Sequence, residues 1–502
     1  MLNDGKLNFF LKKNRTKKIV LCHGVFDVVH IGHINYLKEA KSFGNKLIVS
    51  VTSKKFVNKG SGRPIFNDSE RVKFLRSISF IDYVHINYDY NAISLIEKVK
   101  PSFYCKGKEY LNFKNDLTNN IKKEVETTRR NGGIFKIVNT KTFSSSSLIN
   151  ENFKNYNNEQ KKILSTVKKD LHNNKINKIK ENLKKLSVTV IGEAIIDEYV
   201  FSETIGKSGK DPMLVTKKIK STKFLGGALS IANIMACFVK KVTIITYLGQ
   251  NDSQIPWIKK NLAKNIKIKF VKKNNSPTIY KKRYIDNYFG NKIFGSYKIN
   301  NNLINFSEES KIIKFINEVQ KKDIFCVIDY GHGLFTEKIC NKINKLQNLK
   351  SLNVQFNSFN LSYQKISKFK NFDLACFNQK EIFYELKKHE NSNEINDLTK
   401  DLSISNNFKK TVISFGKDGS KLYDRELKKL NTCPGFIKIA KDRIGAGDSL
   451  FALMTILNKL KISNESTLLL GNYLALLSLE NNGPIQSINS NHFFKHFEHF
   501  IK

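Results

Sequence analysis

The stretch GVFDVVHIGH, residues 24–33, follows the short apolar run IVLC and a single histidine. We predict a strand that runs into a turn and then into a helix. A helix start presents free backbone N–H groups and the positive end of the helix dipole, which favours phosphate binding. His30 and His33 lie there and can donate hydrogen bonds to charge developing on a phosphoryl group, and Gly32 lets a ligand approach the backbone. The stretch therefore indicates a nucleotide-binding turn.

Apolar runs alternate with helical patterns on both sides of this turn. In residues 1–150 we expect strands at KKIVLCHG, KLIVSVTS, IDYVHI, FYCKG and GGIFKIVNT, with helices between them. This alternation is typical of a doubly wound α/β domain with a parallel sheet. Residues 151–185 are rich in Lys and Asn and read as a partly helical linker. The strand pattern restarts at SVTVIGEAIIDEY, so residues 186–502 are predicted to form a second doubly wound α/β domain.

Composition limits the class of protein. A chain of 502 residues with 40% hydrophobic and 26% charged residues is expected to be globular, with more than one core. Its seven cysteines stand singly without a CxxC pair, so neither a zinc site nor a disulfide framework is predicted. No apolar run is long enough to span a membrane, and the first residues do not resemble a secretion signal. We expect a cytoplasmic protein.

The formal net charge of +42 raises the question of nucleic-acid binding. The positive residues are nearly all lysines, whereas arginine is the usual residue for bidentate recognition of phosphates and bases. They are also spread along the whole chain. We therefore expect small anionic substrates rather than a nucleic acid or a membrane as partners.

GVFDVVHIGH resembles the HxGH signature that nucleotidyltransferases share with class I aminoacyl-tRNA synthetases. A synthetase also needs a KMSKS-type signature, and KSGKD is a poor match. TFSSSSLIN matches the Ser/Thr-rich turn of the transferases, while GRPIFNDSERVKFLRSI and FYCKGKEY resemble segments of the adenylyltransferase part of bifunctional heptose kinase/adenylyltransferases. The resemblance implies that a sugar 1-phosphate attacks a nucleoside triphosphate, with Mg²⁺ assisting. It assigns catalysis to His30 and His33, and nucleotide or phosphate contacts to Gly24, Phe26, Asp27, Gly32, Arg71, Lys106, Ser144, Ser145 and Ser146.

The second half carries DRIGAGDS at residues 442–449. Gly445, Ala446 and Gly447 form a loop before an apolar helix, and the N–H groups of such a loop make an anion hole for a transferring phosphate. Asp448 stands at the helix start, where it can accept the proton of an attacking hydroxyl. A Walker-type P-loop is absent from the sequence.

This half resembles the ribokinase-like (PfkB) sugar kinases, whose fold includes a small β lid, over about residues 186–485. The resemblance implies ATP as substrate and Mg²⁺ as cofactor. Within the family it looks most like heptose 7-phosphate kinases, with three departures. His332 stands in place of a lysine, LNVQFNSFN replaces an Asp-Pro-Lys segment, and GKSGKDPMLV is a poor copy of the lid segment. The implied sites are sugar contacts at Asp197, Gly226, Gly227 and Asn233, phosphate and Mg²⁺ contacts at Asn378 and Glu381, and an adenine-side turn at Gly416 and Gly419.

A kinase that makes a sugar 1-phosphate, joined to a transferase that consumes one, is chemically coherent. We predict a bifunctional enzyme that makes ADP-heptose or a close analogue for surface polysaccharide (lipopolysaccharide), with the two domains in the opposite order to the bifunctional heptose enzymes. One alternative is a transferase that uses CTP with another sugar or polyol phosphate. Another is a partly degenerate homologue with a binding role. The sequence leaves open whether the chain forms a homodimer.

Overall fold

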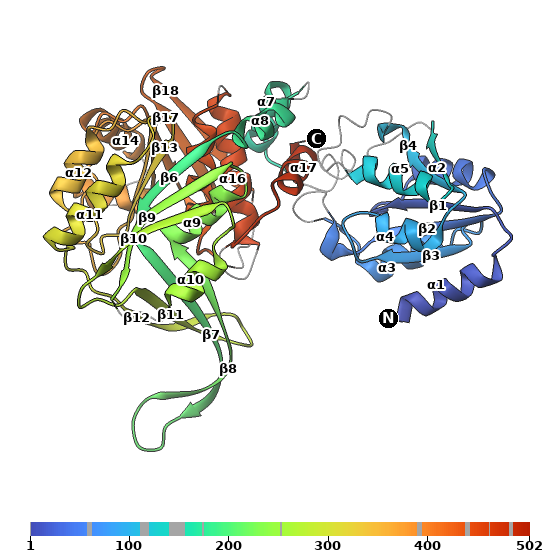
Figure 1. Ribbon diagram of the computed structural model, residues 1–502, viewed down its shortest axis with the longest axis horizontal. Helices are drawn as coiled ribbons and strands as arrows, with labels where there is room; N and C mark the ends of the chain where they lie inside the picture. The colour runs from blue at the N-terminus through green and yellow to red at the C-terminus, as the bar shows by residue number, and fades with distance from the viewer. Residues whose placement is uncertain are drawn as a thin grey trace. The chain divides into compact units, whose positions relative to one another are not determined.

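The structure is a computed structural model that describes residues 2–57, 63–110, 120–139, 156–172, 175–250, 254–388, 394–436, 442–460, 462–480 and 485–501. The chain divides into two compact units (Figure 1). Unit 1 comprises residues 1–157, 172–177 and 489–502, and unit 2 comprises residues 158–171 and 178–488. The predicted domain boundaries at residues 150 and 185 stay predictions.

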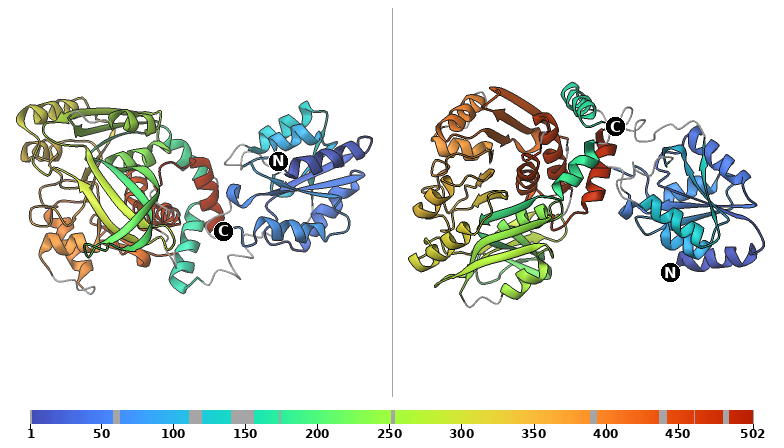
Figure 2. Two further views of the ribbon diagram at one scale, coloured as in Figure 1. Left: turned by 90° about the horizontal axis from the view of Figure 1, so that it is seen from below. Right: turned by 45° about the horizontal axis from the view of Figure 1, so that its top comes forward.

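Unit 1 is built on a five-stranded sheet in the order β3-β2-β1-β4-β5, in which every strand pair is parallel. The predicted doubly wound α/β fold is confirmed, with helices on both sides of the sheet (Figure 2). The strands are β1 (Ile19–Gly24), β2 (Lys46–Thr52), β3 (Tyr83–Asn87), β4 (Phe103–Gly107) and β5 (Ile134–Val138). The helices are α1 (Leu2–Lys13), α2 (Ile31–Ser42), α3 (Asp68–Arg76), α4 (Ile93–Val99), α5 (Asn120–Arg130) and the C-terminal α17 (Ser490–Ile501).

The central strand β1 shows why this sequence makes a two-faced sheet. Successive side chains of a strand point to opposite faces. Val20 and Cys22 pack into one buried cluster, while Ile19 and Leu21 pack into another on the other face. An apolar run without polar alternation is the pattern of a parallel strand covered on both sides. The carboxyl end of β1 leads into the turn that carries Asp27, His30 and His33, so a site can form at this end of the strand.

Unit 2 contains a nine-stranded sheet in the order β10-β9-β6-β13-β14-β15-β16-β17-β18. Its strands pair in parallel from β10 to β16, and β17 and β18 continue the edge as antiparallel strands. The strands are β6 (Ser187–Gly192), β9 (Lys241–Gly249), β10 (Ile266–Lys273), β13 (Ile324–Asp329), β14 (Lys350–Val354), β15 (Leu374–Asn378), β16 (Lys410–Ser414), β17 (Gly419–Asp424) and β18 (Lys429–Pro434).

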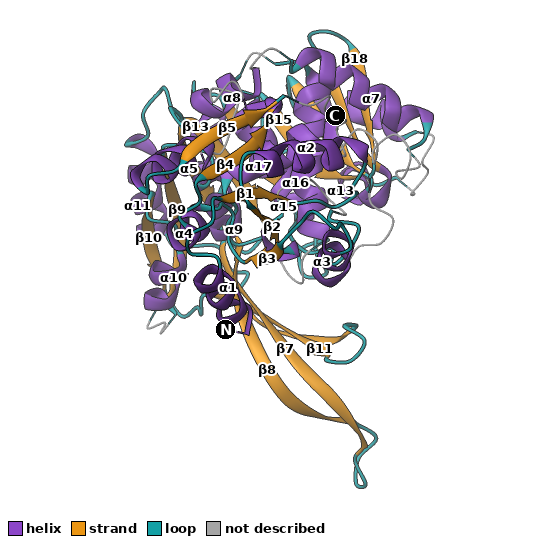
Figure 3. Ribbon diagram, turned by 90° about the vertical axis from the view of Figure 1, so that its right-hand side faces the viewer, coloured by secondary structure: helices purple, strands orange, loops and turns teal. Residues whose placement is uncertain are grey.

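A second sheet of four strands in unit 2, in the order β12-β11-β7-β8, forms the lid. Its strands are β7 (Ala194–Lys207), β8 (Leu214–Gly227), β11 (Ile279–Asp286) and β12 (Lys292–Lys298). Figure 3 shows β7, β8 and β11 running side by side, with the β7–β8 hairpin extending well beyond the rest of the unit. The β7–β8 pairing brings Ala194 opposite Gly227, so the base of the hairpin meets the end of the main sheet.

Two helices of unit 2, α9 and α15, begin directly after the glycines Gly227 and Gly445. Both are almost wholly apolar, and buried residues run through the entire length of α9 and most of α15. No helix in the part of the chain that the structure describes is long and apolar enough to cross a membrane. The helices are α7 (Asn158–Asp170), α9 (Ala228–Ala236), α10 (Ile255–Asn261), α11 (Phe306–Asn317), α12 (Glu337–Asn344), α13 (Gln379–Leu386), α14 (Ile395–Ser405), α15 (Ala446–Leu457) and α16 (Asn464–Leu479); α8 (Lys175–Leu183) begins in the part assigned to unit 1 and continues into unit 2.

Candidate active sites

The predicted strand–turn–helix at residues 24–33 is present between β1 and α2. Phe26 has a left-handed backbone (φ 49°), and its ring lies against Gly24. His30 caps α2, where its Nδ1 accepts a hydrogen bond from the Gly32 N–H at 3.1 Å, and the His30 N–H points to Nδ1 of His33 at 3.4 Å. The centroids of the His30 and His33 rings lie 4.0 Å apart. A neutral ring that accepts at Nδ1 carries its proton on Nε2, so each ring can donate from Nε2 to an anion at the helix start.

Asp27 and Arg71 hold this turn in place. Asp27 accepts hydrogen bonds from Nε of Arg63 at 2.6 Å and from the Phe66 N–H at 3.1 Å, and it is 3% exposed. Arg71 is 1% exposed. Its guanidinium donates to the carbonyls of Val25 (2.7 Å), Thr52 (2.8 Å) and Phe66 (3.2 Å) and to the Asp68 carboxylate (2.6 Å).

All three guanidinium nitrogens of Arg71 are thus used within the chain. This arrangement ties the turn after β1 to the end of β2, and it gives no support to the predicted phosphate contact of Arg71.

Lys106 lies at the end of β4, beside the end of β1. Its Nζ donates to the His23 carbonyl at 3.2 Å and lies 3.6 Å from Oε2 of Glu124, with the Tyr104 and Tyr110 rings nearby. Burial, together with the Lys106 charge, holds the pKa of His23 well below its ordinary value. The predicted phosphate residues Ser144, Ser145 and Ser146 lie outside the described residues.

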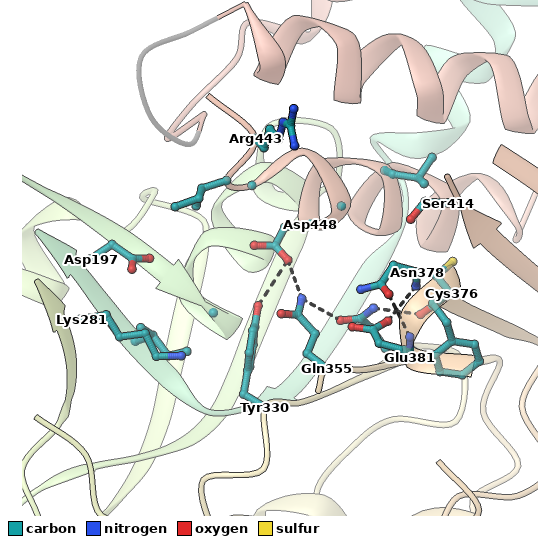
Figure 4. A pocket seen from close by; sticks show the side chains of 18 of the residues that line it. Asp197, Lys281, Tyr330, Gln355, Cys376, Asn378, Glu381, Ser414, Arg443 and Asp448 are labelled. Atoms are coloured by element: carbon teal, nitrogen blue, oxygen red, sulfur yellow. Dashed lines mark hydrogen bonds between the residues drawn. The ribbon is translucent and has the colours of Figure 1, made fainter. Parts of the chain in front are cut away.

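In unit 2 seven of the predicted kinase residues line a cavity of about 310 Å³ (Figure 4). It opens at the start of α15, which Gly445 caps with a left-handed backbone (φ 84°) that favours glycine. The space beside Gly447 is open toward the described residues, because a Cβ added there would meet none of their atoms from another segment within 4 Å. The residues that line the cavity are Ile195, Asp197, Gly227, Lys281, Arg283, Tyr330, Asn353, Gln355, Cys376, Phe377, Asn378, Glu381, Ser414, Arg443, Ile444, Gly445, Gly447, Asp448 and Leu450.

Asp448 lies in the first turn of α15 and faces the cavity. Its Oδ1 accepts hydrogen bonds from the Tyr330 hydroxyl at 3.3 Å and from Nε2 of Gln355 at 3.1 Å. Burial, and secondly the charge of Asp197, raises the pKa of Asp448 to about 6. A carboxyl group with such a pKa is ionised at neutral pH and still basic enough to accept a proton.

Asp197 on β7 forms the opposite wall. It pairs with Arg283 of β11, and the β7–β11 register places Lys281 directly beside it. A Cβ at Gly226 would collide with the Asp197 carboxylate. Burial lowers the pKa of Lys281. The cations of Lys281 and Arg283, which are alternate residues of β11, thus line the same cavity as the carboxylates of Asp197 and Asp448.

Asn378 and Glu381 form a capping box at the start of α13. The Asn378 N–H donates to Glu381 at 2.7 Å, and the Glu381 N–H donates to Asn378 at 2.9 Å. Burial raises the pKa of Glu381 to about 8. Among the described residues no cluster of three or more His, Cys, Asp or Glu side chains suited to a metal is found. Glu381 nevertheless lines the cavity, and its carboxylate oxygens are donors of the kind that Mg²⁺ prefers.

Other predicted residues lie beside the cavity rather than in its wall. The Asn233 amide donates to the Gln486 carbonyl (2.7 Å) and accepts from the Ala263 N–H (2.9 Å), so this cavity gives no support to a sugar contact there. Gly416 and Gly419 form the turn between β16 and β17, just beyond the cavity-lining Ser414.

His332, the histidine in place of the family's lysine, is fully buried and does not line the cavity. Burial, with the charges of Lys281 and Lys273, lowers its pKa to about 3. Its Nδ1 lies 2.8 Å from Oδ1 of Asn301, and Oε1 of Glu193 accepts from its N–H at 3.2 Å. A neutral histidine therefore supports the turn that carries Tyr330.

Sequence reasoning did not single out Lys281, Tyr330, Gln355 or Arg443. Lys281 and Arg283 alternate along KKR, but this pattern points to a site only once the register beside Asp197 is known. Gln355 lies in the segment LNVQFNSFN, which the sequence marked only as a departure from the family.

The parallel sheet with two histidines at a helix start, and the second unit with its Gly-rich loop and buried aspartate, define a nucleotidyltransferase domain and a ribokinase-like carbohydrate kinase domain. The profile of the pfkB family carbohydrate kinases matches residues 185–491, and the cytidylyltransferase-like profile matches residues 21–152. The chain belongs to the pfkB family and carries a cytidylyltransferase-like nucleotidyltransferase domain.

Curated relatives and solved structures agree with this assignment. Bifunctional protein HldE of Blochmanniella floridana is 38% identical over 153 residues, which are 30% of this chain and 31% of the relative. HldE of Geobacter metallireducens is 41% identical over 101 residues, 20% of this chain and 21% of the relative. The match thus spans less than a third of these relatives. The structure of Escherichia coli phosphofructokinase-2 in complex with potassium superposes with a TM-score of 0.50 at 16% identity, covering 61% of this chain and 97% of that one, which shows the fold.

Proposed function

We propose that this chain is a bifunctional enzyme of nucleotide-sugar synthesis. One domain phosphorylates a sugar phosphate with ATP, and the other transfers a nucleotidyl group to a sugar 1-phosphate and releases pyrophosphate. The favoured acceptor is heptose 7-phosphate, phosphorylated at C1, and the favoured product is ADP-heptose. The partial relationship to HldE proteins supports this choice. Because both reactions consume a nucleoside triphosphate, we also propose a cytoplasmic location.

The observation that carries the kinase proposal is the cavity shared by Asp448, Asp197, Lys281 and Arg283. A carboxylate at the start of a helix suits a hydroxyl that must lose its proton, and the adjacent loop N–H groups suit the phosphoryl group that the hydroxyl attacks. Lys281 and Arg283 add positive charge on the acceptor side. This charge favours an acceptor that already carries a phosphate over a neutral sugar.

In the proposed kinase reaction Asp197 holds a hydroxyl of the acceptor and Asp448 takes the proton of the attacking hydroxyl. The backbone N–H groups of Gly445, Ala446 and Gly447 receive the charge that develops on the transferring phosphoryl group. Glu381 would hold Mg²⁺, which neutralises charge on ATP phosphates when bound.

In the proposed transferase reaction the substrates meet at the carboxyl end of β1. His30 and His33 donate from Nε2 to the phosphate under attack, and the start of α2 adds its dipole. Lys106 supplies a further charge beside the same strand end. The reaction needs alignment and charge neutralisation rather than a covalent intermediate.

The two activities are tested separately. The chain is incubated with ATP, Mg²⁺ and a panel of sugar 7-phosphates, and products are identified by mass; pyrophosphate release is then measured with supplied sugar 1-phosphates. We expect a new phosphorylated sugar in the first assay and a nucleotide sugar in the second. Absence of both products would refute the proposal.

The cytidylyltransferase-like match at residues 21–152 favours one second candidate, a transferase that uses CTP with another sugar or polyol phosphate. Pyrophosphate release with ATP against CTP distinguishes the two. A clear preference for CTP would replace ADP-heptose with a cytidine-activated product.

A further inference from the structure

The segment LNVQFNSFN, where the sequence departs from the family, ends in the kinase cavity. β14 stops at Val354, and Gln355 follows with its side chain pointing at Asp448 (Figure 4). The Gln355 N–H donates to the Asp329 carbonyl at 2.8 Å, so its backbone stays tied to β13 beyond the last residue of β14. The backbone position from which the Gln355 side chain extends is therefore held by β13.

A chain of amide hydrogen bonds fixes which end of Gln355 faces Asp448. Nδ2 of Asn353 donates to the Cys376 carbonyl at 2.9 Å, which leaves Oδ1 of Asn353 as an acceptor. Nε2 of Gln355 donates to that oxygen at 3.2 Å and to Oδ1 of Asp448 at 3.1 Å. Since an amide nitrogen has two N–H groups, both donors of Gln355 are used. The carbonyl of Cys376 thus determines the orientation of the amide that meets Asp448.

The two oxygens of Asp448 differ as a result. Oδ1 receives the hydrogen bonds from Gln355 and Tyr330, whereas no hydrogen bond to Oδ2 is found among the described residues. An oxygen that already accepts two hydrogen bonds is the poorer proton acceptor. Oδ2 is then the oxygen available to the acceptor hydroxyl.

We propose that Gln355 is a positioning residue for the catalytic base: its amide holds Oδ1 of Asp448 and leaves Oδ2 to take the proton of the acceptor hydroxyl. This inference rests on the proposed kinase function. A neutral amide also suits the surroundings, because the negative charges of Asp197 and Glu381 already act on Asp448, together with the Lys281 cation and the Tyr330 hydroxyl. The hydrogen bond from Gln355 acts to lower the pKa of Asp448.

Two substitutions test the role of Gln355 in the full chain. Gln355→Glu keeps the shape and adds a like charge beside Asp448, so the acid limb of the kcat profile should move up by about one pH unit or more. Gln355→Met removes both donors at similar volume, and kcat should fall about tenfold or more because a hydrogen bond to a charged group is lost. The KM for ATP should stay unchanged in both variants.

Gln364→Met is the matched control, because its buried amide donates to the Asp329 carbonyl and lies outside the cavity wall. Its acid limb should stay in place. The melting temperature of unit 2 shows that each variant folds, and pyrophosphate release by unit 1 shows that the rest of the chain is intact.

Parental kcat and an unmoved acid limb in both Gln355 variants would overturn the positioning role while leaving the kinase function intact. A parent chain without sugar phosphorylation would overturn both.

Discussion

Replacing Gly227 with alanine tests whether this glycine is needed for the fold or only for sugar contact. Gly227 joins β8 to α9 with φ 56° and ψ −136°, a conformation that residues other than glycine rarely adopt. A Cβ there would lie 2.6 Å from the Glu193 carbonyl oxygen and 2.9 Å from the Ile195 side chain.

The cost of Gly227→Ala has two parts. The backbone conformation costs an alanine about 1–3 kcal/mol. An ordinary contact begins near 3.4 Å, so the Glu193 carbonyl must also retreat by about 0.8 Å, the difference between 3.4 and 2.6 Å. Overpacking of this kind costs about 1–3 kcal/mol. We therefore expect the free energy of unfolding of unit 2 to fall by about 2–6 kcal/mol, with a loss of kinase activity because Gly227 borders the cavity.

The assay is chemical denaturation of the full chain, followed by kinase activity under conditions where the variant remains folded. Gly209→Ala, at the turn of the β7–β8 hairpin, is the control, because no atom of another segment among the described residues lies within 4 Å of the added Cβ. It should unfold like the parent. A Gly227→Ala protein that is as stable as the parent and differs only in its KM for sugar would show that this glycine serves sugar contact and not the fold.

The charged groups give three further predictions. Burial raises the pKa of Asp448 to about 6, and the ionised form is the base. Kinase kcat should therefore fall as the pH drops through that value, to about one tenth of its maximum near pH 5. A kcat that stays constant down to pH 5 would contradict this prediction. Arg71→Met should destabilise unit 1 by about 3 kcal/mol or more, since buried partners lose their donors; a stable variant with only a raised KM for nucleotide would instead support a phosphate contact. Lys281→Met should raise the KM for a phosphorylated acceptor about tenfold or more. Lys282→Met, whose lysine pairs with Glu198, should leave this KM unchanged. Equal increases of the KM in both variants would exclude the charge of Lys281 in the cavity as the cause of the increase.

The parts that sequence predicts well here are those that depend on local pattern. The succession of Ile19, Val20, Leu21 and Cys22 without polar residues indicates a doubly covered strand, and the structure buries each of them. The Gly-rich loop before Asp448 likewise indicates a helix start, because backbone conformation and helix capping are local properties.

The parts that sequence misses depend on partners far along the chain. The sequence predicts a phosphate contact for Arg71 in the segment SERVKFLRSI, which stays a prediction, but it does not indicate that the same guanidinium donates to the carbonyls of Val25 and Thr52. Lys281 can be recognised as a residue of the site only from the β7–β11 register, which places it beside Asp197. Hydrogen bonds between segments far apart in the sequence determine whether a polar residue stabilises the fold or binds a ligand. The pattern of apolar residues along the chain does not show these hydrogen bonds.

If the chain holds two independent active sites, the masses of the products formed by three proteins will show it. The parent, Asp448→Asn and His33→Ala proteins are each given ATP, Mg²⁺ and heptose 7-phosphate, and separately heptose 1-phosphate with ATP. Asp448→Asn should lose the doubly phosphorylated sugar and still form the nucleotide sugar, while His33→Ala should do the reverse. Loss of both products in either folded variant, or of neither, would contradict the account.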